Sequence, residues 1–170
     1  MNPGAMIERM ARYPAVLRAT AMSVCADDAR WKPGPEHWSI LEVCCHMLDE
    51  EREDFRVRLR STLENAARAW APLDLKDVAT LRSYNAGDLG RTLDDFEKER
   101  ADSVAWLRSL RGVDWSIAYV HPKVGPVRAG ELLASWAAHD ALHLRQISRR
   151  LYQLAGRDAP GMSTVYAGEW

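Results

Sequence analysis

The sequence predicts an all-α fold, a four-helix bundle. Four stretches place apolar residues three and four positions apart, the spacing of an amphipathic helix. No stretch shows the clear alternation of a strand, and the links between the four stretches are uneven in length. The predicted helices span residues 4–27, 39–63, 88–111 and 129–155. The chain of 170 residues is long enough for one sizeable core, so we expect a single domain over residues 1–170.

The first predicted helix has a break inside it and another after it. Its apolar residues are Met6, Met10, Tyr13, Leu17 and Val24. Pro14 lacks a backbone N–H, so we expect it to kink or restart the helix. Pro33, Gly34 and Pro35 follow as a cluster and predict a turn.

The second predicted helix has the clearest start signal. Ser39 and Glu42 form a capping-box pattern, and Trp38 can pack onto Val43 as a hydrophobic staple. His46 lies at the edge of the apolar stripe that follows, with Glu50 one turn later. A histidine in that position is not informative alone.

A long connection over residues 66–87 precedes the third predicted helix, with a short helical turn expected near Asp77 to Arg82. About 25 residues of helix would span roughly 37 Å, so this connection can run the length of the bundle. An up-down-down-up topology then becomes available, in which residues 39–63 and 129–155 form antiparallel neighbours. That arrangement would bring His46 towards the fourth helix.

The third predicted helix begins at Asp88, a suitable N-cap, and ends at Gly112. Its charged side, from Asp94 to Arg100, is expected to be a solvated face. Residues 113–129 are expected to form a loop or at most a short hairpin.

The fourth predicted helix carries the most informative motif, His139-Asp140-Ala141-Leu142-His143, and is expected to close at Gly156. On a helical wheel, both histidines fall in the apolar stripe formed by Leu132, Trp136, Ile147 and Leu154. Burying two imidazoles is costly unless each is hydrogen-bonded or bound to something. The pair therefore predicts a metal site, and a pair of core histidines satisfied by their neighbours is the alternative.

Other assignments of this motif are weaker. It differs from the H-E-x-x-H zinc-protease motif by Asp140, and no histidine follows His143 as a further ligand. Asp140 or Glu50 could orient an imidazole or could be an ordinary surface carboxylate. His121 lies in a loop and is left out of the predicted ligands.

The composition excludes several classes of protein. The chain has 23 basic and 24 acidic residues, a net charge of −1 and 47% apolar residues. This balance does not suggest nucleic-acid or membrane binding. Glu8, Arg9 and Arg12 come too early for a signal peptide, so we expect a cytoplasmic protein. Three cysteines make no disulfide framework, and Cys44 and Cys45 are expected to fill the core.

Several features together resemble the DinB/YfiT-like superfamily of metal-dependent enzymes. No single motif is strong, but their order and spacing are specific and cover most of the chain. They are Trp38-Ser39-Ile40 with His46, Tyr84-Asn85, His121-Pro122 with Gly125, and His139-Asp140 with His143 and Gln146. Asp140 is a departure, because a number of relatives have Glu there.

The resemblance implies a four-helix bundle, often dimeric, with a three-histidine site for a divalent metal such as zinc or nickel. Carried onto this sequence, the ligands would be His46, His139 and His143. It also implies a small-molecule substrate and either hydrolysis or transfer to a low-molecular-weight thiol. The competing hypothesis is a non-catalytic dimeric module with a structural or vestigial histidine site.

A homodimer is also suggested by tryptophan usage, since the chain has seven tryptophans and two phenylalanines. Trp31, Trp70 and Trp170 lie outside the predicted helices, where an apolar ring would need a partner surface.

Overall fold

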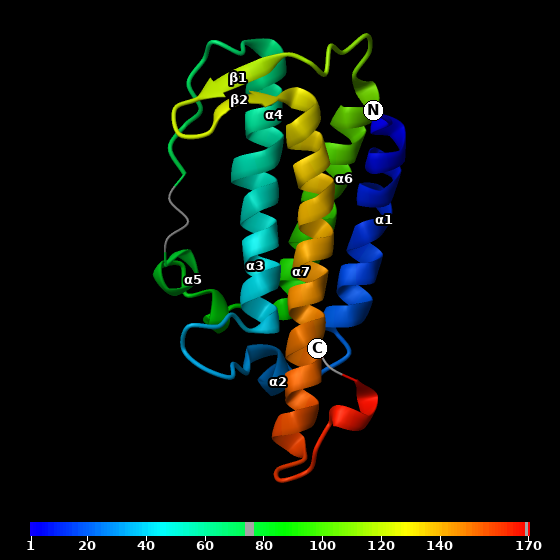
Figure 1. Cartoon of the computed structure of the whole chain (residues 1–170), viewed down its shortest axis with the longest axis vertical. Coiled ribbons are helices and arrows are strands. Elements are labelled where there is room, and N and C mark those ends of the chain that lie inside the picture. The colour runs from blue at the N-terminus through cyan, green and yellow to red at the C-terminus, as the bar shows by residue number, and fades with distance from the viewer. Residues whose placement is uncertain (74–76, 169) are drawn as a thin grey trace.

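The computed structural model describes residues 1–73, 77–168 and 170. It is mainly helical, as the sequence predicts, with long helices packed side by side and a small hairpin at one end (Figure 1). The long helices are α1 (Pro3–Ala21), α3 (Ile40–Asp49), α4 (Phe55–Glu64), α6 (Leu89–Ser109) and α7 (Ala129–Asp158), and a π-helical turn, η1 (Glu50–Asp54), joins α3 to α4. The short elements are α2 (Ala26–Arg30), α5 (Val78–Leu81), η2 (Tyr84–Ala86), β1 (Ala118–His121), β2 (Gly125–Arg128) and η3 (Val165–Ala167).

Ion pairs between helices define their relative directions. Near the end of α1, Arg18 pairs with Asp94 near the start of α6, and at the opposite ends Glu8 pairs with Arg108. The helices α1 and α6 are therefore antiparallel.

The helices α3 and α4 run in the same direction as α6. Arg52 lies 3.4 Å from Asp95, and further along both helices Arg56 lies 3.3 Å from Ser103. The chain between α4 and α6 therefore returns along the bundle (Figure 1), and residues 74–76 of this connection lie outside the described residues. The helical turn expected near Asp77 to Arg82 is confirmed as α5.

The prediction for the first helix needs two corrections. The helix ends at Ala21 rather than at residue 27, and a separate short helix, α2, follows. Pro14 does not interrupt α1. A proline within a helix leaves the carbonyl four residues earlier without its partner. Here that carbonyl belongs to Met10, and Arg100 donates a hydrogen bond to it over 3.3 Å.

The second predicted helix starts where expected but is not regular throughout. The capping box is present: Ser39 Oγ accepts from the Glu42 N–H, and Glu42 accepts from the Ser39 N–H. The prediction of one regular helix over residues 39–63 is wrong in its middle, because η1 separates α3 from α4. A π-helical turn holds an extra residue and is common near functional sites.

The third predicted helix is confirmed from its N-cap, where Asp88 accepts from the Arg91 N–H over 2.8 Å. The expectation of a solvated charged side is wrong at Arg100, which is only 2% exposed. Arg100 lies four residues after Phe96 and four before Val104, and all three are buried.

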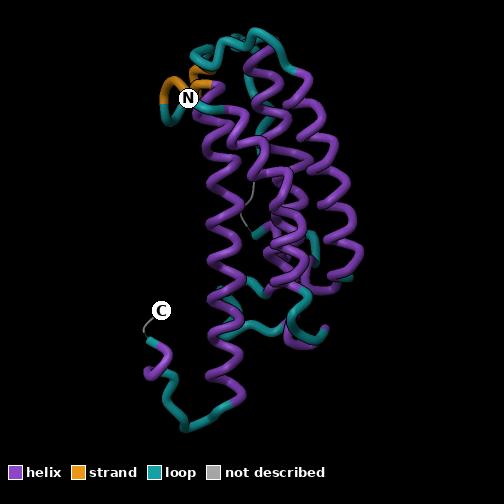
Figure 2. Tube along the Cα trace, turned by 90° about the vertical axis from the view of Figure 1, so that its right-hand side faces the viewer, coloured by secondary structure: helices purple, strands orange, loops and turns teal. Residues whose placement is uncertain are grey.

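The last helix, α7, continues through Gly156 to Asp158 rather than closing at Gly156. A glycine inside a helix costs only about 1 kcal/mol relative to alanine. Figure 2 shows this end of α7 projecting beyond the other helices. At the other end, the short hairpin of β1 and β2 is confirmed, with Tyr119 paired to Val127.

Two of the three tryptophans outside the predicted helices pack within the chain. Trp31 packs against the core and has the Arg157 guanidinium 5.3 Å from its ring, while Trp70 stacks on Tyr119 at 4.2 Å. Trp170 is 54% exposed. The argument for a partner surface is therefore wrong for Trp31 and Trp70, and the homodimer stays a prediction. Among the described residues, no helix is long and apolar enough to cross a membrane.

Candidate metal centre

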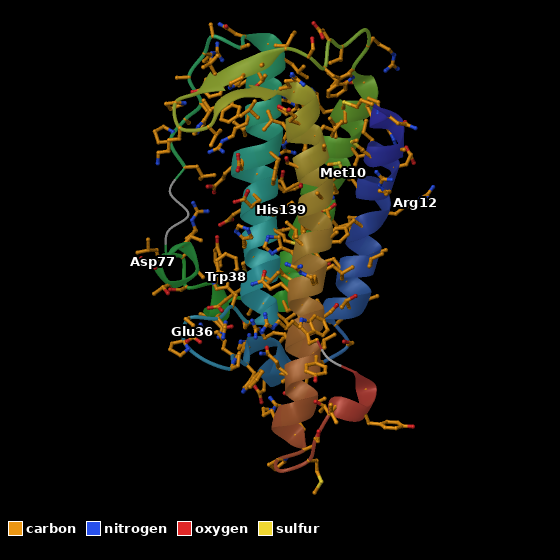
Figure 3. All side chains as sticks on the ribbon, viewed as in Figure 1. Met10, Arg12, Glu36, Trp38, Asp77 and His139 are labelled. Atoms are coloured by element: carbon orange, nitrogen blue, oxygen red, sulfur yellow. The ribbon has the colours of Figure 1, made fainter. Side chains whose placement is uncertain are left out.

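Three histidines from two helices meet inside the bundle. His46 comes from α3, and His139 and His143 come from consecutive turns of α7. One potential ligand atom from each lies within 4.8 Å of the other two. Figure 3 labels His139 in the region between α3 and α7. The tertiary structure thus brings together all three residues of the predicted site.

The two histidines of α7 face each other through the same ring nitrogen. Nε2 of His139 and Nε2 of His143 are 3.0 Å apart. On the other side of the His143 ring, Nδ1 lies 2.9 Å from Oε1 of Gln146. An amide oxygen can only accept, so this bond assigns a proton to Nδ1 and leaves the Nε2 lone pair of His143 directed at the cluster.

Aromatic rings enclose the cluster. The Trp38 ring lies 4.8 Å from the His46 ring, and the Phe55 ring lies 5.0 Å from the His139 ring. Phe55 in turn stacks on Trp136 with an interplanar angle of 6°. These contacts cover the His46 and His139 rings with aromatic side chains.

This enclosure keeps the imidazoles neutral. Burial, followed by the neighbouring His143, lowers the pKa of His46 to about 3. Burial, followed by the charges of the other two histidines and Arg100, lowers the pKa of His139 to about 3. Burial also lowers the pKa of His143, although the hydrogen bond that His143 donates to Gln146 acts in the opposite direction. Neutral imidazoles keep the lone pairs that metal ligands need.

Glu50 lies next to His46 rather than at the surface. Its Oε1 is 3.8 Å from Nδ1 of His46, and the residue is 5% exposed. Burial, followed by the nearby Asp54 carboxylate, raises the pKa of Glu50 to about 8. The separation from His46 is longer than a hydrogen bond, so a small rotation is needed to join the two groups.

Asp140 does not orient an imidazole and is not a surface carboxylate, so both expectations for it are wrong. Its two oxygens accept from Arg100 over 2.7 and 2.8 Å, and it is 5% exposed. Glu51 lies 3.0 Å from the same guanidinium and accepts from Trp136 Nε1 over 2.9 Å. Because Asp140 is fixed to Arg100, it is not placed as the base of a zinc-protease motif.

The sequence did contain a signal for this buried network. Glu51 falls on the apolar stripe between Met47 and Phe55, and Asp140 lies four residues after Trp136. Charged residues at core positions of three helices predict mutual pairing, because a buried charge needs a partner.

His121 stays outside the cluster, as expected, with its ring 5.8 Å from Trp70. Cys44 is fully buried, as expected of a core residue, whereas Cys45 is half-buried and contacts Thr92.

The residues present fit a divalent ion. The donor set is three neutral imidazoles, one nitrogen of each lying within 4.8 Å of the other two. With Nδ1 of His143 protonated, Nε2 of His139 donates to Nε2 of His143 over 3.0 Å, and a metal ion would take the place of that shared proton. Three histidine ligands leave a coordination position open, which is typical of catalytic zinc sites. Of the three histidines, His143 also borders a solvent-open hollow of about 880 Å³.

Residues 9–147 match the family model of the DinB superfamily. The chain belongs to the DinB superfamily. Among solved structures, this DinB chain is similar to YfiT from Bacillus subtilis, with a TM-score of 0.80 and 18% identity over 90% of this chain and 87% of that one. YfiT is described as a probable metal-dependent hydrolase with an unusual four-helix bundle topology, and the likeness shows that the two chains share this fold. No curated protein matches.

Proposed function

We propose that this protein is a metal-dependent hydrolase in which His46, His139 and His143 bind one divalent ion, zinc or nickel. The observation that carries the proposal is the convergence of three neutral imidazoles within 4.8 Å. The description of YfiT as a probable metal-dependent hydrolase supports the same class of reaction.

The residues around the site prepare the ligands. Gln146 accepts from Nδ1 of His143 and so holds its Nε2 free for binding. Glu50 is the carboxylate placed to accept from a protonated Nδ1 of His46. Arg100 pairs with Asp140 of α7 and with Glu51 of η1, and so holds these two elements together. Since His139 is next to Asp140 in α7, this contact helps to position His139 along the axis of α3.

A divalent ion bound here would lower the pKa of a bound water and polarise a substrate carbonyl. Trp38 and Phe55 cover the His46 and His139 rings, so substrate would approach from the hollow beside His143.

The same site supports transfer to a low-molecular-weight thiol as the competing reaction, because a bound metal also lowers the pKa of a thiol. Burial raises the pKa of Cys44 to about 12, so the protein's own core thiol is not a nucleophile. A thiol would have to come with the substrate. The third alternative is metal binding without turnover.

Elemental analysis of untagged protein purified without chelator tests the proposal. We expect about one zinc or nickel ion per chain in the wild type and almost none in His143→Ala. His37→Ala is the matched control, because His37 is 43% exposed and lies outside the cluster. Full metal content in His143→Ala would refute the assigned ligands.

Metal loss during purification calls for a second measurement. Zinc at 100 times its Kd should stabilise the wild type by about 2.7 kcal/mol and should leave His143→Ala unchanged. Zinc-loaded protein should then hydrolyse activated esters without added thiol. An absolute requirement for a thiol would favour the transferase.

A further inference from the structure

The hollow beside His143 has cationic walls. It measures about 880 Å³, and the residues that line it include His143, Gln146, Arg145, Arg149 and Trp170. Among the described residues that line it, none is acidic. The hollow therefore joins a histidine of the proposed metal site to a concentrated positive charge.

Two of its arginines form no ion pair with any residue that the structure describes. Arg145 and Arg149 are both exposed, and no carboxylate of the described residues lies within 4 Å of either guanidinium. They are four residues apart on α7 and so share one helix face, where two like charges destabilise the helix slightly. Two free guanidinium groups at this spacing are suited to bind one oxyanion.

The third arginine of the hollow has a structural role instead. Arg150 is 4% exposed, and its Nε donates to the Trp38 carbonyl over 2.8 Å. It ties α7 to the segment that precedes α3. This contact leaves Arg145 and Arg149 as the groups available to a ligand.

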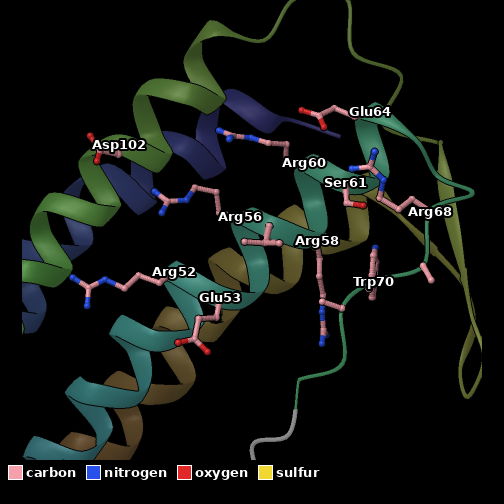
Figure 4. Close-up of a pocket in the computed structure, with 13 residues that line it drawn as sticks. Arg52, Glu53, Arg56, Arg58, Arg60, Ser61, Glu64, Arg68, Trp70 and Asp102 are labelled. Atoms are coloured by element: carbon pink, nitrogen blue, oxygen red, sulfur yellow. The ribbon is translucent and has the colours of Figure 1, made fainter.

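A second hollow in this protein is also lined by several arginines. It measures about 620 Å³ and lies along α4 (Figure 4), away from the three histidines. Three of its five arginines are paired: Arg52 and Arg56 with Glu99, and Arg58 with Asp54 over 2.7 Å. Arg60 and Arg68 have no ion pair among the described residues, so the distinguishing feature of Arg145 and Arg149 is that they share a hollow with His143.

We propose that Arg145 and Arg149 bind a carboxylate or phosphate group of the substrate and hold the rest of the molecule against His143. The proposal deepens the proposed function and rests on it for the reaction, whereas oxyanion binding itself can be measured separately. It defines the substrate as a small organic anion with a carboxylate or phosphate group.

Calorimetry with simple probes tests this proposal. Succinate and inorganic phosphate are titrated into zinc-loaded and metal-free wild type, into Arg145→Gln/Arg149→Gln and into Arg9→Gln/Arg91→Gln. The last variant removes the same net charge from exposed arginines that do not line the hollow. Succinamide is the uncharged probe of similar size. Circular dichroism checks that each variant is folded.

We expect at least one of the two anions to bind the wild type and the Arg9→Gln/Arg91→Gln control equally. Binding to Arg145→Gln/Arg149→Gln should be about tenfold weaker or worse, since each bond to a charged group contributes roughly 1.5–3 kcal/mol. Succinamide should not bind. The preferred probe distinguishes a carboxylate from a phosphate substrate.

Three results would overturn the proposal: no anion binding by the wild type at millimolar concentration, equal binding by the arginine variant, or equal binding of succinamide. Metal content is measured in parallel. Arginine-dependent anion binding by a protein that takes up no metal would refute the proposed function and leave the oxyanion site standing. Normal metal uptake with arginine-independent binding would refute the oxyanion site alone.

Discussion

Replacing Arg100 by methionine should be one of the most destabilising single changes in this protein. Arg100 is the only cation among the described residues that pairs with both Glu51 and Asp140, and these three side chains are 2%, 1% and 6% exposed. Methionine has a similar length and fills most of the space. The change therefore removes the charge while keeping most of the packing.

The expected cost follows from what Arg100 leaves behind. Asp140 loses two hydrogen bonds of 2.7 and 2.8 Å, and Glu51 loses an ion pair of 3.0 Å. The Met10 carbonyl, which has no helical partner because Pro14 lacks an N–H, loses the hydrogen bond from Arg100. Breaking a buried ion pair by removing one partner costs about 3–5 kcal/mol. For a chain of this size, that corresponds to a fall in Tm of roughly 6–20 °C.

Urea denaturation followed by circular dichroism measures this loss in metal-free protein. The matched control is Arg108→Met, whose partner Glu8 is 49% exposed and whose own side chain is 52% exposed. An exposed pair contributes about 0–1 kcal/mol. The triple variant Glu51→Gln/Arg100→Met/Asp140→Asn should recover part of the loss, because it removes the uncompensated carboxylates.

The reasoning would be refuted if Arg100→Met cost no more than Arg108→Met. It would also be refuted if the triple variant were as unstable as Arg100→Met, because the loss would then come from packing and not from stranded charges.

Three further predictions concern acid stability, the tryptophan donor and assembly. Because folding lowers the pKa of His139 to about 3, the unfolded chain binds protons between pH 6.5 and 3 that the folded chain does not, so stability falls as pH falls. Between pH 6 and 4, the free energy of unfolding of metal-free His139→Gln should fall less steeply than that of the metal-free wild type, by up to about 1.4 kcal/mol per pH unit. Urea midpoints that change with pH in parallel in the two proteins would contradict this. Trp136→Phe removes the N–H that donates to Glu51, so it should lower the free energy of unfolding, measured in urea, by about 1–3 kcal/mol. The control is Trp106→Phe, since the Trp106 ring contacts the exposed Arg60, and its loss should be smaller. Equal losses in the two variants would show that the bond to Glu51 contributes nothing. Light scattering at micromolar concentration should give the mass of a homodimer, and a monomer mass would end that prediction.

Local patterns predicted much of the helical structure because the information they use is local. The capping box at Ser39 and Glu42 and the N-cap at Asp88 are formed within four residues of chain, and both are confirmed. The same periodicity failed where a distant group changed the outcome. Pro14 predicts a break, but the carbonyl it strands is satisfied by Arg100, which lies 90 residues away.

The sequence by itself determined that His139 and His143 share the inward face of one helix, because a spacing of four residues fixes that geometry without any partner. It did not determine what those rings would meet. Only the tertiary structure decided that His46 reaches them from α3, that Glu50 lies beside His46, and that Arg100 is drawn inward between Glu51 and Asp140. These outcomes depend on the register between helices and on a π-helical turn in the second one, and both are set by packing across the bundle rather than by the order of neighbouring residues.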